Sequence, residues 1–134
     1  MIDLSSHGVG ALIIKRKRFL LIQEARQPLA GSWRIPGGVC EPGDNSEEVS
    51  VKREIMEKLG LEVKPNKKIW TAKADIRAKT VSFWLVTNVK GKVKLDSKVS
   101  SNFNWFTPEQ ALKLKLYPAT RDFFTLLQKK QILE

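Results

Sequence analysis

Hydrophobic positions along the chain predict a series of strands interrupted by one central helix, with further helices near the end. Two short apolar runs, 9–14 and 19–23, flank the basic segment 15–18, and this arrangement predicts a buried hairpin whose turn lies in water. Runs rich in β-branched and aromatic residues predict further strands. These lie at 61–76, 79–89 and 101–106, with a weaker one at 92–95.

Turn-forming residues separate the predicted hairpin from the central helix. The segment 27–38 is rich in glycine and proline, and we expect it to be a loop. Residues 44–46 are all good N-cap residues, and Gly60 is a good C-cap. We therefore expect a helix between them that ends at about Leu59.

Two more helices are predicted in the last part of the chain. Pro108 suits the first position of a helix, and the pattern at 118–131 is amphipathic, with Phe123, Leu126 and Leu127 facing inward. Together with the strands, these helices predict an α/β (α+β) fold. Its expected form is an α/β/α sandwich with a mixed sheet and a central loop-helix-loop motif.

Length and composition suit one domain with an anionic partner. A chain of 134 residues fits a single domain, 1–134. No apolar run reaches the roughly 18–20 residues that span a membrane, the N-terminus lacks a signal-peptide pattern, and the single cysteine excludes an internal disulfide framework. We expect a cytoplasmic protein with no membrane partner. The net charge of +10 favours a polyanionic partner, with dispersed, solvated lysines as the alternative explanation.

The central helix places acidic side chains beside its buried stripe. At about 100° per residue, an apolar stripe runs from Val51 to Leu59, while Glu47, Glu54 and Glu57 share the neighbouring face. Carboxylates held together next to a core need a cation, and oxygen ligands suit Mg²⁺ or Mn²⁺. The alternative is an exposed amphipathic helix whose glutamates are simply solvated.

The residues around this helix resemble the signature of the Nudix hydrolases, Gly-x5-Glu-x7-Arg-Glu-U-x-Glu-Glu-x-Gly-U, in which U is aliphatic. Gly38 matches the first glycine, 53–57 (Arg-Glu-Ile-Met-Glu) matches Arg-Glu-U-x-Glu, and 60–61 matches the closing Gly-U. The segment 33–38 is similar to the Trp-x-x-Pro-Gly-Gly that precedes the signature in the family. The likeness covers nearly the whole chain. It implies a Nudix-type pyrophosphohydrolase that cleaves a nucleoside diphosphate linked to another group, with Mg²⁺ or Mn²⁺ as cofactor.

The resemblance also implies roles for individual residues. Glu54 and Glu57 would be metal ligands, either of them also serving as the base, and the Gly37 carbonyl would be a further ligand. Arg53 would be catalytic in the sense of orienting a loop carboxylate, for which Asp44 is the expected partner. Substrate contacts are expected from Gly38 and Arg34.

The sequence departs from the family pattern in three places. Lys58 stands where the second glutamate of the pair is expected, which puts an ammonium in place of a metal ligand. The loop glutamate is absent, and Asp44 or Asn45 takes its place, with one extra residue before the helix. No acidic residue lies at 98–104, where many relatives have one, and Asp96 is the nearest.

Two functions follow from the same residues. The first is a metal-dependent hydrolase acting on a small nucleotide, in which Lys58 weakens metal binding. The second is a Nudix-fold protein with reduced catalysis that uses its basic surface to bind a nucleotide or RNA. A homodimer is a further expectation, because dimers are common in the family.

Overall fold

Two four-stranded sheets form the centre of the molecule, and the computed structural model describes residues 6–73 and 76–130. In the first sheet the strand order is β5-β1-β7-β6. β1 is parallel to β7, whereas the other neighbours are antiparallel, so the sheet is mixed as predicted. Its strands are β1 (His7–Leu12), β5 (Gly37–Val39), β6 (Glu62–Lys73) and β7 (Thr80–Lys90).

The second sheet is antiparallel and is built around β3. This strand pairs with β2, β4 and β8. The pairing of β3 with β8 shifts register between Gln23 and Glu24, so the end of β3 is irregular. Its strands are β2 (Ile14–Lys15), β3 (Arg18–Glu24), β4 (Trp33–Arg34) and β8 (Ser100–Phe106).

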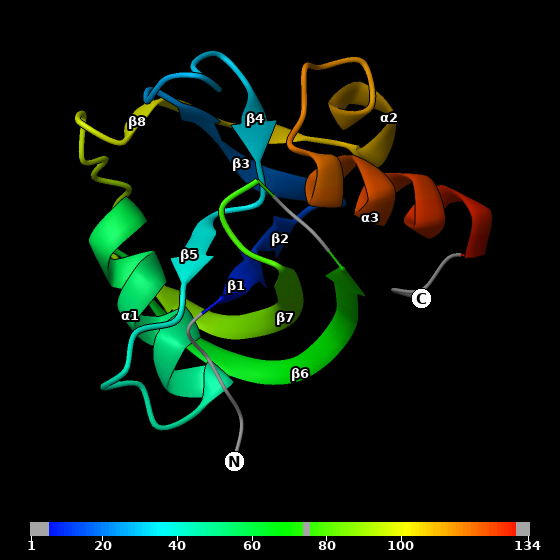
Figure 1. The fold of residues 1–134 in the computed structure, drawn as a ribbon. Coiled ribbons are helices and arrows are strands. Elements are labelled where there is room, and N and C mark those ends of the chain that lie inside the picture. Colours follow the sequence, from blue (N-terminus) through cyan, green and yellow to red (C-terminus); the bar gives the residue numbers. More distant parts are fainter. Residues whose placement is uncertain (1–5, 74–75, 131–134) are drawn as a thin grey trace.

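Two long helices cover the sheets from opposite sides. Figure 1 shows α1 (Glu47–Leu59) on one side of the strands and α3 (Pro118–Lys130) on the other, with the short α2 (Pro108–Ala111) next to α3. This is the predicted α/β/α sandwich. β1 lies in the interior between the helices, and all six of its residues are buried.

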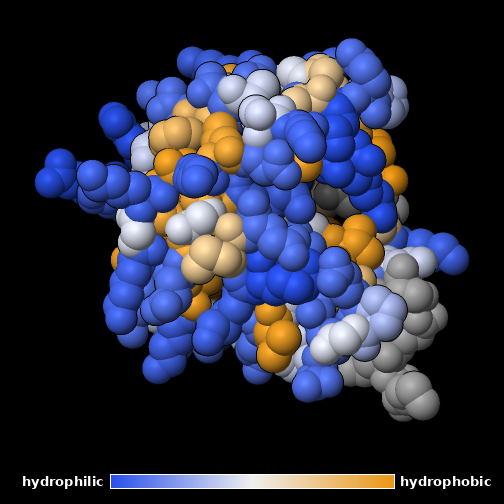
Figure 2. All heavy atoms as spheres, turned by 90° about the vertical axis from the view of Figure 1, so that its left-hand side faces the viewer, coloured by the Kyte–Doolittle hydropathy of each residue, from blue (hydrophilic) through white to orange (hydrophobic). Residues whose placement is uncertain are grey.

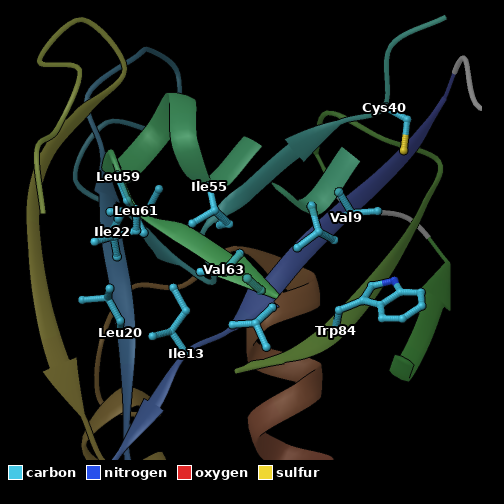
Figure 3. Packing of buried hydrophobic residues seen from close by; sticks show 13 residues of the cluster. Val9, Ile13, Leu20, Ile22, Cys40, Ile55, Leu59, Leu61, Val63 and Trp84 are labelled. Atoms are coloured by element: carbon cyan, nitrogen blue, oxygen red, sulfur yellow. The ribbon is translucent and has the colours of Figure 1, made fainter. Parts of the chain in front are cut away.

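The core is divided into two clusters by the sheets. One cluster packs under α1, and Figure 3 shows Ile55 and Leu59 of this helix facing residues of the strands, among them Leu20 and Val63. The other packs under α3 and contains the aromatic side chains of Phe19, Phe83, Phe123 and Phe124, whose rings meet mostly edge to face.

The limits of α1 follow from its capping residues, as predicted. The Ser46 side chain accepts a hydrogen bond of 3.2 Å from the backbone N–H of Val49. Gly60 has φ 66°, the left-handed conformation that ends a helix, and its N–H donates to the carbonyl of Met56. The predicted apolar stripe from Val51 to Leu59 is fully buried.

The structure corrects the prediction for the start of the chain. The basic segment 15–18 does form a tight turn, with positive φ at Arg16 and Lys17, but it joins β2 to β3. β1 leaves this hairpin and joins the other sheet, where it lies between β5 and β7. The apolar run 9–14 therefore serves two sheets, which its hydrophobicity alone does not reveal.

Two other predictions of local structure need correction. The segment 27–38 is not wholly a loop, because β4 lies within it and β5 begins in it. The segment 92–95 forms no strand. The strands predicted at 61–76, 79–89 and 101–106 correspond to β6, β7 and β8, although residues 61, 76 and 79 are not in strands. Residues 74 and 75, and residue 131 of the last predicted helix, lie outside the described part.

The surface is largely hydrophilic. Figure 2 shows the face that carries α1, where hydrophobic residues occur as small patches between charged and polar ones. Within residues 6–73 and 76–130, no helix has the length and apolar character needed to cross a membrane.

Candidate functional site

A pocket with a volume of about 380 Å³ opens where β5, α1 and the start of β7 meet. Its apolar wall includes Val81 and Phe83 of β7 and Ile35, which lies between β4 and β5. Two polar groups also line it. The first is Glu54, Glu57 and Lys58 of α1, and the second is Arg26, Arg34, Arg77 and Tyr117.

Glu54 lies at the buried edge of α1, and both of its carboxylate oxygens have a cationic partner. Oε1 accepts a hydrogen bond of 2.8 Å from Nζ of Lys58, one turn later on the same helix. Oε2 accepts one of 3.0 Å from Nη1 of Arg53. Side-chain exposure is 5% for Glu54 and 14% for Lys58, so this ion pair is largely shielded from water. Charge-assisted bonds of this kind are stronger than neutral ones.

Glu57 is the more accessible of the two predicted glutamates. Its side chain is 51% exposed, and its oxygens lie 3.2 and 3.3 Å from the same Nη1 of Arg53. The structure therefore brings Glu54 and Glu57 together through one guanidinium. Because a carboxylate can accept up to about four hydrogen bonds, Glu57 keeps lone pairs for water or a ligand.

Arg53 also ties the loop before α1 to the helix. Its Nε donates to Oδ1 of Asp44 at 3.0 Å and its Nη2 to Oδ2 at 2.7 Å, a two-pronged contact between the residues expected to pair. The Ser50 hydroxyl and the backbone N–H of Glu41 donate to the same carboxylate. The Arg53 hydrogen bond is the main reason why the pKa of Asp44 is lowered, so this carboxylate stays charged.

The glycine pair is required by packing. A Cβ atom at Gly37 would overlap the carbonyl of Val9 on β1, and one at Gly38 would overlap the Glu54 carboxylate. The main chain of β5 can therefore approach β1 only without a side chain at Gly37, and a side chain at Gly38 would require the Glu54 carboxylate to move. The Gly37 carbonyl, an expected metal ligand, accepts a hydrogen bond of 2.9 Å from Nη1 of Arg34.

A second polar cluster surrounds Glu24, which the sequence did not predict as a site residue. Glu24 has a side-chain exposure of 0% at the irregular end of β3, and Arg26 donates to it at 2.8 and 3.0 Å. The Tyr117 hydroxyl donates to it as well. Burial would raise the pKa of Glu24, but the hydrogen bonds from Arg26 and Tyr117 outweigh it and lower the pKa to about 2.

Arg34 joins this cluster to the glycine pair. Its guanidinium is buried, lies 5.4 Å above the centre of the Tyr117 ring, and has an Nε without a hydrogen-bond partner among the described residues. The sequence does contain a sign of this cluster. Glu24 directly follows the apolar run 19–23, and Arg26 comes two positions later. A buried strand that ends in a carboxylate needs a cation nearby.

The other acidic residues weighed as metal ligands lie elsewhere. Glu47 accepts a 2.9 Å hydrogen bond from the Trp84 indole and another from Lys68, so it faces the strands of the mixed sheet. Asp96 accepts from the backbone of Lys98 in an exposed turn. Neither joins Glu54, which corrects the expectation that Glu47 shares the carboxylate face.

The oxygens expected to hold a divalent cation already meet cations of the chain. Both helix glutamates contact Arg53, Glu54 also contacts Lys58, and the Gly37 carbonyl meets Arg34. Within the described residues, no group of three or more His, Cys, Asp or Glu side chains is arranged to hold a metal ion. A resident Mg²⁺ or Mn²⁺ does not fit Glu54 as it is held here, because the ion would lie beside the ammonium of Lys58 and the guanidinium of Arg53.

Comparisons with known proteins agree with the fold. The chain is 30% identical over 114 residues to the CTP pyrophosphohydrolase of Escherichia coli K12, covering 83% of this chain and 82% of that protein. It is 33% identical over 131 residues to the nucleoside triphosphatase NudI of the same bacterium, covering 84% and 89%.

Solved structures and a family model extend this similarity. A MutT NUDIX hydrolase from Burkholderia pseudomallei superposes with a TM-score of 0.78 at 27% identity, covering 90% of this chain and 95% of that one. The MutT protein of Methanosarcina mazei Go1 gives 0.75 at 30% identity, covering 93% and 94%. The model of the NUDIX domain matches residues 5–127, a range that includes the whole pocket lining. The chain therefore belongs to the Nudix family of hydrolases.

Proposed function

We propose that this protein hydrolyses a phosphoanhydride bond in a nucleoside diphosphate linked to another group, with nucleoside triphosphates included. The observation that carries the proposal is the pocket in which Glu57 and Lys58 share one lining with Arg34 and an apolar wall. The names of two relatives, a CTP pyrophosphohydrolase and a nucleoside triphosphatase, support the same class of substrate.

The chemistry of the pocket suits phosphoryl transfer. Such reactions depend mainly on positioning and on neutralising the charge of the phosphates. Positive groups of three kinds face the pocket: the Lys58 ammonium, the buried Arg34 guanidinium and the more accessible Arg26 and Arg77. Ile35 and Phe83 offer an apolar surface on which a flat base can rest.

Glu57 is our assignment for the group that accepts a proton from the attacking water. A general base needs a lone pair that faces the water. Both oxygens of Glu54 have close charged donors at 2.8 and 3.0 Å, whereas Glu57 meets a single guanidinium at 3.2–3.3 Å and is half exposed. Arg53 would then position Glu57 and hold the loop of Asp44 in place.

Divalent cations enter this proposal with the substrate. Mg²⁺ binds through one or two carboxylates together with phosphate oxygens of a nucleotide. A Mg²⁺ or Mn²⁺ ion carried on the substrate's phosphates needs fewer protein ligands than a resident ion. Reactions should therefore be measured with both ions present.

The test is product release from a panel of nucleoside triphosphates and nucleotide sugars, separated by ion-exchange chromatography. We expect the wild type to release a nucleoside monophosphate from at least one of them. Glu57→Gln should lower the rate by about 100-fold or more. Glu62→Gln, an exposed carboxylate on β6 outside the pocket lining, is the control and should leave the rate unchanged. Absence of product from the whole panel would contradict the proposed activity.

A further inference from the structure

Lys58 brings a positive charge into the pocket at a point where the Nudix signature has a glutamate. It lies in the last turn of α1, one turn after Glu54, and its ammonium is 2.8 Å from that carboxylate. Only 14% of its side chain is exposed, so the ammonium is held in the pocket lining and does not extend into water. The position is thus occupied by a cation of the chain itself.

This ammonium and a divalent ion would compete for the same oxygen. Oε2 of Glu54 accepts from Arg53 and Oε1 from Lys58, so a divalent ion at either oxygen would lie beside a cation of the chain. Moving the ammonium aside would leave a positive charge beside a divalent ion in a shielded pocket, where repulsion is stronger than in water. The other expected ligand, the carbonyl of Gly37, is held by Arg34.

The ammonium also has unused capacity. A lysine ammonium carries three donors, and among the described residues Lys58 makes one hydrogen bond, to Glu54. Lys58 and Glu57 both line the pocket. Phosphate oxygens are strong acceptors for such donors.

We infer that the Lys58 ammonium takes the place of one divalent cation in this pocket and binds a phosphate oxygen of the substrate directly. The part concerning phosphate rests on the proposed function, whereas the part concerning the metal does not. A single charge attached to α1 then supplies the neutralisation that a bound metal gives elsewhere. Nucleotide binding should as a result persist when free divalent ions are removed.

The first experiment measures Mn²⁺ binding without nucleotide, by the loss of the free-ion signal in electron paramagnetic resonance. Wild type is expected to bind Mn²⁺ only in the millimolar range. Lys58→Glu should bind at least tenfold more tightly, because it removes the ammonium and adds a carboxylate. Lys52→Met, which removes an exposed lysine of the same helix, is the control and should match wild type. Equal Mn²⁺ affinities in wild type and Lys58→Glu would overturn the inference.

The second experiment measures binding of a non-hydrolysable α,β-methylene nucleotide by calorimetry in the presence of EDTA. Wild type should bind, Lys58→Met should bind at least tenfold more weakly, and Lys52→Met should remain within twofold of wild type. Equal binding by wild type and Lys58→Met would overturn the role of Lys58 toward phosphate. Lys58→Met keeps the length of the side chain, so it also serves in the Mn²⁺ titration if Lys58→Glu does not fold.

The two experiments separate this inference from the proposed function. If no nucleotide is bound or cleaved, the proposed function fails, but the Mn²⁺ titration still decides whether the ammonium excludes a metal. If wild type hydrolyses nucleotides and binds Mn²⁺ as tightly as Lys58→Glu does, the proposed function stands and the inference fails.

Discussion

The hydroxyl of Tyr117 donates a hydrogen bond to the carboxylate of Glu24, and the two residues are separated by 93 positions in the chain. Tyr117 precedes α3, whereas Glu24 ends β3, so the bond joins the start of the last helix to the second sheet. Both groups are buried, and Arg26 completes the shell of the carboxylate. The polar cluster beside the pocket therefore also holds distant parts of the fold together.

Tyr117→Phe should destabilise the protein. The change removes one donor from a buried carboxylate and adds no volume, so the free energy of unfolding should fall by about 1–3 kcal/mol. Urea denaturation followed by tryptophan fluorescence measures this. Thr125→Ala removes an exposed hydroxyl of α3 and should change the stability by less than about 0.5 kcal/mol. Equal effects of the two substitutions would show that the Tyr117 bond contributes nothing.

Stability should fall in acid as Glu24 becomes protonated. Its pKa is about 2 in the folded protein, against an ordinary value of 4.5. Because the folded pKa is the lower one, the carboxylate stabilises the fold above pH 4.5, and this contribution is lost as the pH falls from 4.5 towards 2. Its size is at most about 3 kcal/mol.

The measurement is the free energy of unfolding at several pH values, for wild type and for Glu24→Gln. The difference between the two proteins isolates the contribution of Glu24 from that of Asp44, whose pKa is also lowered. Below pH 4.5 we expect the free energy of unfolding to fall more steeply with decreasing pH for wild type than for Glu24→Gln. Parallel curves would mean that Glu24 has the same pKa in the folded and unfolded states.

Arg53→Lys should weaken both the fold and the proposed activity. A lysine ammonium cannot make the two-pronged contact with Asp44 and reach Glu57 at the same time. We expect a loss of about 1–3 kcal/mol in the free energy of unfolding, and a lower rate of hydrolysis because Glu57 loses its fixed position. Arg18→Lys, an exposed position on β3, is the matched control for stability. Similar values for both variants would show that the guanidinium geometry is unimportant.

Gly38→Ala and Gly43→Ala form a matched pair. A Cβ at Gly38 would overlap the Glu54 carboxylate, whereas one at Gly43 meets no atom within 4 Å. Gly38→Ala should cost about 1–3 kcal/mol, and it should displace Glu54 from Lys58. Gly43→Ala should be nearly neutral. Thermal unfolding of both variants, with a crystal structure of Gly38→Ala, tests this directly; an unmoved Glu54 would contradict the packing argument.

Much of the fold was predictable from local pattern. The helix between Ser46 and Gly60 is defined by its capping residues and by an apolar stripe, which are properties of neighbouring residues. The division of 9–14 between two sheets was not predictable, because it depends on β1 pairing with β7, a partner far away in the sequence. A continuous apolar run shows that a segment is buried but does not identify its neighbours.

The candidate site was predictable in part for the same reason. Glu54, Glu57 and Arg53 stand on one helix, so spacing places them together. The cluster of Glu24 with Tyr117 depends on a register shift in β3 and on the position of the segment before α3. Neither can be seen in a single sequence, whereas the pairing of Lys58 with Glu54, one turn apart on the same helix, follows from spacing.

Because β1 is completely buried, it should tolerate few amino-acid substitutions. Every residue from His7 to Leu12 faces a packed layer, whereas most residues of β6 have at least partial contact with solvent. A library that randomises β1 should yield few folded clones. Tolerated substitutions should not alternate along the strand, because none of its positions is exposed. Randomising β6 should give many folded clones, so this edge strand can accept substitutions that the buried strand cannot.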